Sequence, residues 1–336
     1  MAVIYLLASR LAAVLCMPIR PLFAFCLAVA FAAPALALDL QAHRGGRGLR
    51  PENTLAAFEN AIRMGVTTLE LDIAITADGV AVISHEPALY PGTARDADGR
   101  WLKEPGPLIR SLTLAEVQRY DVGRLNPDSA YGKPFATQQP ADGQRIPTLA
   151  SLFALVDKLG ANDVQFDIET KIFPHRPTDT VTPEVFVDTL LAAIRAAGVT
   201  RRVMIQSFDW RTLALVQRLE PGLRTVYLTI ESRNSNNVQD PAWTAGRVAR
   251  DYPSVAHMVK AAGGTIWAPN FNNIDAGSAQ RAHELGLQLV PWTVNEEADM
   301  RRLIEWGVDG IITDYPDRLR EVMRERGLAL PPGVSR

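Results

Sequence analysis

Two histidines and two carboxylates lie close together in the sequence, between residues 43 and 85. The first histidine, His43, ends a short apolar run and is followed by Arg44, a glycine cluster and a helical pattern capped by Asn53 or Thr54. Glycines let a backbone approach a ligand closely, and a helix N-terminus presents N–H groups to an anion. The stretch therefore suits anion binding, although a surface His–Arg pair at a simple strand–turn–helix junction is the alternative.

Glu70 and Asp72 lie in a strictly alternating segment, residues 68–75, so both carboxylates point from one face of an expected strand. Such a pair repels unless a cation lies between the two groups. The opposite face is apolar, which argues against a solvated acidic strand. Because oxygen ligands favour hard ions, the pattern predicts a calcium or magnesium site. A turn and a second short strand then lead to His85.

Taken together, these residues resemble the glycerophosphodiester phosphodiesterase family, from about residue 41 to the last expected strand. One departure is visible: Glu86 follows His85 where the family usually has aspartate, and either carboxylate could orient the histidine. The segments that carry the resemblance are HRG at 43–45, PENT at 51–54, ELD at 70–72, TADG at 76–79, His85, ETK at 169–171, QSF at 206–208, WTVN at 292–295 and GVDGIITDYP at 307–316.

The chemistry of a phosphodiester suggests roles for the charged residues. The phosphorus gains negative charge as it becomes five-coordinate, so cations must be fixed in advance. We expect Arg44 and Lys171 to contact the phosphate, and Glu70, Asp72 and Glu169 to hold a divalent metal. Glu169 and Lys171 could instead form a strand-end ion pair. The resemblance implies that the metal is often Ca²⁺ in exported members and Mg²⁺ in some intracellular ones, so we expect Ca²⁺, with Mg²⁺ as the alternative.

The resemblance also implies that His43 and His85 are the acid–base pair, a role that suits imidazole because its ordinary pKa is about 6.5. We expect His43 to accept a proton and His85 to donate one. We expect Gln206, Phe208 and Trp292 to line the substrate pocket, with strand capping or burial in the core as their alternatives.

Five other titratable residues receive no catalytic role in this interpretation. We expect His175, His257 and His283 to lie at the surface or to serve packing. Asp309 and Asp314 are expected to set turns around the last strand.

The function that the resemblance implies is metal-dependent hydrolysis of glycerophosphodiesters, the deacylated phospholipids, to sn-glycerol 3-phosphate and an alcohol. The alternatives are a phospholipase D-like enzyme of the same fold and a non-catalytic phosphodiester-binding barrel. The binding barrel is disfavoured because both histidines and all three metal carboxylates are present. Glycoside hydrolysis is disfavoured because Glu70 and Asp72 are too close in a polar cluster for one to stay protonated as the acid.

Eight strand-like runs alternate with eight amphipathic helical runs, which predicts an α/β protein of the (β/α)8 TIM-barrel type. An open doubly wound sheet is disfavoured because the glycines lack dinucleotide-type spacing. Residues 86–145 interrupt the alternation after the second strand and are expected to form a cap-like insertion. The expected strands are 40–43, 68–75, 164–169, 203–206, 223–228, 265–268, 288–293 and 310–313, and the expected helices are 54–64, 149–159, 183–197, 210–219, 254–262, 277–285, 296–306 and 316–326.

Composition and the N-terminal segment indicate which partners and which localisation to expect. The chain has 336 residues, 47% of them hydrophobic, and a net charge of −2, so nothing indicates a nucleic-acid partner. We expect residues 1–37 to be a signal peptide that is cleaved near Ala37, and translation could begin at Met17. The mature protein would then comprise residues 38–336. It is expected to be exported, either periplasmic or secreted, with no stable membrane span. Both cysteines lie in the signal, and the oligomeric state is not predicted.

Overall fold

The computed structural model of the protein describes residues 37–334. The signal peptide expected over residues 1–37 lies outside the described residues, apart from Ala37. Within the described part, no helix is both long and apolar enough to cross a membrane.

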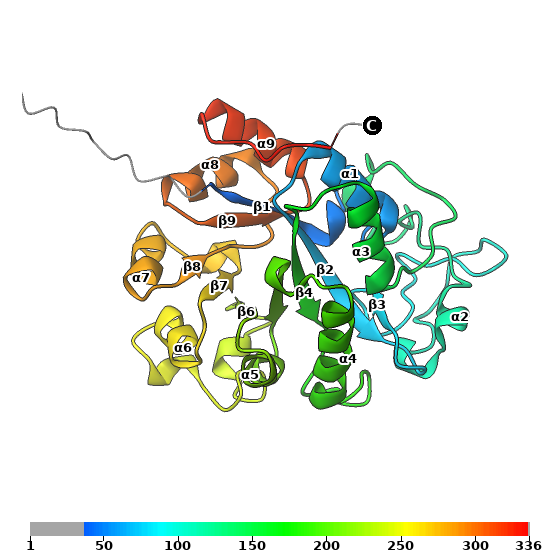
Figure 1. Cartoon of the computed structure of the whole chain (residues 1–336), viewed down its shortest axis with the longest axis horizontal. Helices are drawn as coiled ribbons and strands as arrows, with labels where there is room; N and C mark the ends of the chain where they lie inside the picture. The colour runs from blue at the N-terminus through cyan, green and yellow to red at the C-terminus, as the bar shows by residue number, and fades with distance from the viewer. Residues whose placement is uncertain (1–36, 335–336) are drawn as a thin grey trace, which may run out of the picture. The chain divides into compact units, whose positions relative to one another are not determined.

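Eight parallel strands of the described chain form a nearly closed barrel, with helices outside it (Figure 1). The strand order is β8-β7-β6-β5-β4-β2-β1-β9, and a ninth strand, β3 (Ala81–Ile83), pairs antiparallel with β2. The barrel predicted from the sequence is confirmed. The parallel strands are β1 (Asp39–Ala42), β2 (Thr68–Ile75), β4 (Gln165–Thr170), β5 (Val203–Ser207), β6 (Arg224–Thr229), β7 (Ile266–Pro269), β8 (Gln288–Leu289) and β9 (Gly310–Thr313).

The barrel closes between its last strands. The N–H of Asp309 donates to the carbonyl of Leu289 at 2.9 Å, and the N–H of Ile312 donates to the carbonyl of Pro291 at 3.0 Å. The strand expected over 288–293 is cut to Gln288–Leu289, and Pro291, which has no N–H to donate, lies just beyond its end. The other predicted strands begin and end within one or two residues of the observed ones.

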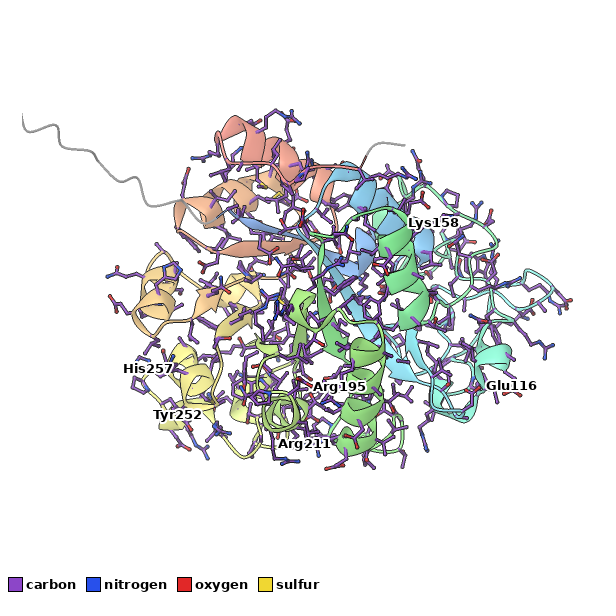
Figure 2. The ribbon with its side chains drawn as sticks, in the orientation of Figure 1. Glu116, Lys158, Arg195, Arg211, Tyr252 and His257 are labelled. Carbon is purple, nitrogen blue, oxygen red and sulfur yellow. The ribbon has the colours of Figure 1, made fainter. Side chains whose placement is uncertain are left out.

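The helices of the outer layer also follow the predicted ranges, and they bury one face against the strands. Their opposite faces carry exposed charged side chains, such as Lys158 on α3 and Arg195 on α4 (Figure 2). The outer helices are α1 (Leu55–Met64), α3 (Leu149–Lys158), α4 (Pro183–Ala196), α5 (Trp210–Leu219), α6 (Val255–Ala261), α7 (Ser278–Glu284), α8 (Glu297–Glu305) and α9 (Pro316–Glu325).

Two carboxylates, those of Asp39 and Asp167, lie inside the barrel. Asp39 accepts from Thr68 Oγ1 at 2.7 Å and from Gln41 Nε2 at 2.9 Å. Asp167 is fully buried, and neither of its carboxylate oxygens has a hydrogen-bond partner among the described residues. Burial, together with the charges of Asp39 and Glu169, raises the pKa of Asp167 well above its usual range.

The insertion at residues 86–145 is mostly irregular and lies beside β2 and β3 (Figure 1). It has a small apolar cluster in which Leu89, Ile109 and Val117 pack with Ala74 and Val82 of the two strands. The helical pieces of the insertion are η2 (Ile109–Ser111), α2 (Leu114–Val117) and η3 (Lys133–Phe135).

Candidate active site

The first part of the site is the sharp turn after β1. Arg44 has φ 53°, and Gly45 and Gly46 have φ 80° and 86°, a left-handed conformation that glycine adopts without strain. A Cβ on Gly45 would lie 2.9 Å from the Cβ of Ala57, so the turn packs directly on α1. The turn aims the Arg44 N–H at Glu70 Oε2, at 2.7 Å.

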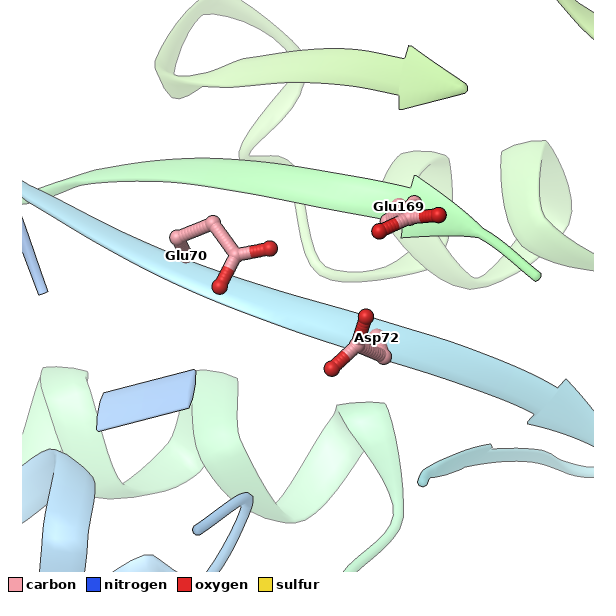
Figure 3. A group of neighbouring side chains, drawn as sticks. All are labelled: Glu70, Asp72 and Glu169. Carbon is pink, nitrogen blue, oxygen red and sulfur yellow. The ribbon is translucent and has the colours of Figure 1, made fainter. Parts of the chain in front are cut away.

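Three buried carboxylates meet beside this turn. Glu70 and Asp72 of β2 and Glu169 of β4 each offer an oxygen within 4.8 Å of the others (Figure 3). The parallel register pairs Asp72 with Glu169, which places these residues side by side on neighbouring strands. Oδ1 of Asp72 is buried and has no hydrogen-bond partner among the described residues. A hard divalent cation fits this set, since it would satisfy that oxygen and neutralise the charges.

The triad is electrostatically unbalanced without a cation. Burial, and then the charges of Asp72 and Glu169, raises the pKa of Glu70 well above its ordinary value. Burial raises the pKa of Glu169 to about 7, although Lys171 acts against the increase. Burial would also raise the pKa of Asp72, but the charges of His85, Arg44 and Lys171 together hold it below its ordinary value.

His43 is held by a residue that the sequence interpretation placed elsewhere. Its Nδ1 lies 2.6 Å from Oδ1 of Asp314, and its Nε2 lies 3.9 Å from Oε2 of Glu70. Asp314 was expected only to set a turn after β9; the structure corrects this and places it against a catalytic candidate. Asp314 also accepts from Arg47 Nε and Asn295 Nδ2, each at 2.8 Å.

His85 lies between a carboxylate and a lysine. Its Nδ1 is 2.8 Å from Oε1 of Glu86, so the glutamate at this position does orient the ring. Its Nε2 is 3.0 Å from Nζ of Lys171, which also donates to Glu169 Oε1 at 2.9 Å. Burial, followed by the charges of Arg44 and Lys171, lowers the pKa of His85 to about 4. The imidazole is therefore neutral near pH 7, with Nε2 accepting from the ammonium group.

Arg44 is fixed by two further residues that sequence reasoning missed. Its Nη1 donates to Glu52 Oε1 at 2.9 Å and to the hydroxyl of Tyr131 at 2.8 Å. The same hydroxyl accepts from Arg47 Nη1 at 2.9 Å and donates to Glu52 Oε2 at 2.5 Å. The insertion thus reaches the site through Tyr131.

Asn53 was expected as one of two candidate caps of the helix after the turn. It instead donates to Asp72 Oδ2 at 2.9 Å, and Thr54 caps α1.

A cavity with a volume of about 160 Å³ lies over these groups. Phe208 and Trp292 form one wall, with their rings edge to face at 5.3 Å between centroids. Gln206 lines the cavity and donates to Glu70 Oε1 at 2.5 Å. The structure brings together all ten site residues expected from the sequence, nine of them on the cavity wall and Asp72 against Lys171 and Asn53.

The other three histidines lie away from this cavity. His175 is exposed and lies 2.6 Å from Asp240, and His283 is exposed and lies 2.9 Å from Asp309. His257 lies 2.9 Å from the hydroxyl of Ser254 at the start of α6. None of the three lines the cavity, in line with the surface and packing roles expected for them.

The fold and the site define a barrel hydrolase with an anion pocket beside an acidic triad, and comparison with known proteins gives the family. The glycerophosphoryl diester phosphodiesterase family model matches residues 43–318. A glycerophosphodiester phosphodiesterase of Caldanaerobacter subterraneus is 30% identical over 286 residues, which cover 85% of this chain and 98% of the relative. The chain therefore belongs to the glycerophosphoryl diester phosphodiesterase family, and the enzyme class expected from its motifs is confirmed.

Solved structures agree with this assignment. A protein of Silicibacter pomeroyi, described as a glycerophosphoryl diester phosphodiesterase, superposes with a TM-score of 0.79 at 34% identity, covering 88% of this chain and 96% of the other. A phosphodiesterase of Oleispira antarctica, solved with the product sn-glycerol-3-phosphate, gives a TM-score of 0.62 at 20% identity, covering 86% and 97%. At that identity the second likeness shows the fold alone.

Proposed function

We propose that the protein hydrolyses glycerophosphodiesters in a metal-dependent reaction, releasing sn-glycerol 3-phosphate and an alcohol. One observation carries the proposal: two histidines, three cationic side chains and two carboxylates of the buried triad face a single small cavity, and the third carboxylate, Asp72, lies within 4.8 Å of the other two. The curated relative is named for this activity, and the Oleispira enzyme was solved with this product. A cavity of about 160 Å³ suits a glycerol phosphate moiety rather than a lipid chain.

The two histidines supply the acid–base chemistry in this proposal. Asp314 holds the Nδ1–H of His43, which leaves Nε2 free to accept a proton from the attacking hydroxyl. We expect a neighbouring glycerol hydroxyl to attack phosphorus first, giving a cyclic phosphate that water then opens. His85 donates a proton to the departing alcohol oxygen. Because its pKa is about 4 in the free protein, it must take up that proton beside the anionic substrate.

The remaining cavity residues bind and orient the substrate. Arg44 and Lys171 face the cavity and balance the phosphate charge, and both are already fixed by carboxylates, so little ordering remains on binding. Phe208 and Trp292 offer an apolar wall to the glycerol carbons.

A divalent cation completes the site in this proposal. Glu70, Asp72 and Glu169 would hold it, and when bound it supplies charge stabilisation to the phosphoryl oxygens. We propose Ca²⁺ as the native ion because the resemblance implies Ca²⁺ in exported members, with Mg²⁺ as the alternative; three carboxylate ligands suit either ion.

The test uses the chain from Leu38 onward, assayed on glycerophosphocholine with coupled detection of glycerol 3-phosphate. Activity should be lost with EDTA and restored by Ca²⁺ or Mg²⁺, and the ion that restores it at the lower concentration is the native one. His43→Ala and His85→Ala should abolish turnover while leaving substrate binding measurable. Choline release from an intact phospholipid without glycerol 3-phosphate would instead support the phospholipase D-like alternative, and binding without turnover the non-catalytic barrel.

We also propose that the protein is exported, with cleavage near Ala37. The apolar run from residue 21 and the small residues at 35 and 37 support this proposal. N-terminal sequencing of the protein recovered from its native host tests it: a mature chain beginning at Leu38 is expected, and a chain that retains residues 17–37 would contradict it.

A further inference from the structure

A second cavity, with a volume of about 370 Å³, opens beside the first. The two cavities share Lys171 and Phe208 in their walls. A phosphodiester has two arms on one phosphorus, so a phosphate held at Lys171 can place its glycerol in the first cavity and its alcohol in the second. We call the second cavity the side cavity; its walls beyond Lys171 and Phe208 are Phe173, Asn234–Asn237, Asp240 and Trp243.

Two loops build the side cavity and hold each other in place. The loop after β4 contributes Phe173 to the wall, and the loop after β6 contributes Asp240 and Trp243. The ring of Trp243 meets Phe173 edge to face at 6.2 Å, and Asp240 Oδ2 lies 2.6 Å from His175 Nε2. The Trp243 carbonyl accepts from the N–H of Trp210 at 2.7 Å, which ties the second loop to α5. The aromatic wall is therefore preorganised rather than formed on binding.

The charges around the side cavity disfavour a cationic occupant. Lys171 stands at its inner end, and the guanidinium of Arg176 stacks on Phe173 at 4.1 Å from the ring centroid. Asp240 is the one carboxylate on the cavity wall, and both of its oxygens are engaged, Oδ2 by His175 and Oδ1 by the N–H of Ala242 at 3.0 Å. A quaternary ammonium group would meet the ammonium of Lys171 on the wall and no uncommitted carboxylate, whereas Arg176 is outside the lining and is paired with Asp179 at 3.0 Å.

The chemistry of the rim suits hydroxyl groups. Residues 234–236 are Asn, Ser and Asn, all exposed, and they present amide and hydroxyl groups next to the aromatic wall. An aromatic face with hydrogen-bonding groups around it binds a compact ring or chain of hydroxylated carbons, whose C–H groups pack and whose O–H groups find partners.

We propose that the side cavity is the subsite for the leaving alcohol and that it selects a neutral, hydroxyl-rich alcohol, of the glycerol or inositol kind, over choline or ethanolamine. The proposal rests on the proposed function and adds a substrate class to it. Trp243 is its specificity-determining residue, because it supplies the ring against which the alcohol packs.

The test compares kcat/KM on glycerophosphoinositol, glycerophosphocholine and glycerophosphomethanol, whose methyl group is too small to reach Trp243. The wild-type protein should prefer the inositol diester over the choline diester by roughly tenfold. Trp243→Ala should remove most of that preference while leaving the methyl diester within about twofold, and Trp243→Phe should keep part of it. Tyr252→Ala is the matched control, since Tyr252 (Figure 2) lines a separate cavity and packs against the core.

Each outcome decides between the two proposals. A wild-type preference for the choline diester, or an equal loss on all three diesters in Trp243→Ala, would overturn the side-cavity proposal and leave the proposed function intact. Inactivity on all three diesters would overturn the proposed function. In that case, calorimetry with the inositol and choline diesters tests the side-cavity proposal. Tighter binding of the inositol diester, lost in Trp243→Ala, would support the proposal. Equal binding of the two diesters would overturn it.

Discussion

At the scale of single residues, the site works through pairs in which one side chain fixes another. His43 has Asp314, His85 has Glu86, and Lys171 has Glu169. The first and third pairs are largely buried, and the charge of a buried group is screened far less than that of a surface group; Glu86 in the second pair is partly exposed. The effect of a substitution should therefore depend on the partner left behind.

Asp314→Asn tests the first of these pairs. The amide can no longer hold the Nδ1–H tautomer of His43, so kcat should fall by about 10²–10⁴-fold with the fold intact. Asp309→Asn is the matched control, because Asp309 accepts from Leu289 N–H and from exposed His283, away from the cavity. Steady-state kinetics with circular dichroism checks the prediction; equal losses in the two variants would contradict it.

Metal affinity should depend on pH through the triad. The pKa of Glu169 is raised to about 7, so in the metal-free protein this group carries a proton at pH 6 that a cation must displace; burial raises the pKa of Glu70 in the same direction. A protonated carboxyl is a poor ligand, so affinity should weaken as the pH falls from 8 to 6, by roughly tenfold in all for one displaced proton whose pKa is about 7. Calorimetric titration of EDTA-treated protein with Ca²⁺ measures this. Equal affinities at the two pH values would contradict it.

The residues that were found from the sequence and those that were missed differ in physical terms. Glu70 and Asp72 share a strand, so two-residue periodicity was enough to place their side chains together. Asp314 follows β9 directly, and the rule that barrel sites gather at strand C-termini could have singled it out. Tyr131 had no such signal, because it lies in an irregular insertion whose path no periodicity describes.

At the scale of elements, the strands place the site and the insertion braces it. Apart from the end of β8, strand boundaries were predictable because apolar runs alternate with amphipathic helices over the whole barrel. The path of residues 86–145 was not, because its cluster around Leu89, Ile109 and Val117 depends on contacts with β2 and β3 rather than on local pattern.

Tyr131→Phe tests the brace. Loss of the hydroxyl removes a shared partner of Arg44, Arg47 and Glu52, so KM for glycerophosphodiesters should rise about three- to tenfold, as expected for a lost hydrogen bond to charged groups. Tyr90→Phe is the control, since Tyr90 packs edge to face on Tyr131 at 5.4 Å within the same insertion. Steady-state kinetics on both variants gives the answer; an unchanged KM in Tyr131→Phe would show that the insertion does not support the site.

At the scale of the whole molecule, the barrel contains a buried carboxyl that has no partner. Asp167 lies in β4, and both of its oxygens lack a hydrogen-bond partner among the described residues; burial and the charges of Asp39 and Glu169 raise its pKa against the opposing charge of Arg224. Such a group costs stability, so the isosteric change Asp167→Asn should raise the free energy of unfolding by about 1–2 kcal/mol.

Urea unfolding of the metal-free protein measures this gain. Asp163→Asn, at an exposed position just before β4, serves as the control and should change stability by less than about 0.5 kcal/mol. A loss of stability in Asp167→Asn would mean that the carboxyl has a favourable role inside the barrel.

Because the first strand of the barrel pairs with the last, the active site can form only after nearly the whole chain has been synthesised. Strand β1 pairs with β9, and His43 finds Asp314 across 271 residues of sequence. A chain emerging from the ribosome holds its first catalytic candidate long before it holds that residue's partner. Any chain that stops before residue 314 therefore lacks an oriented His43, however well its earlier strands have folded. Assembly of the active site is therefore among the last events of synthesis.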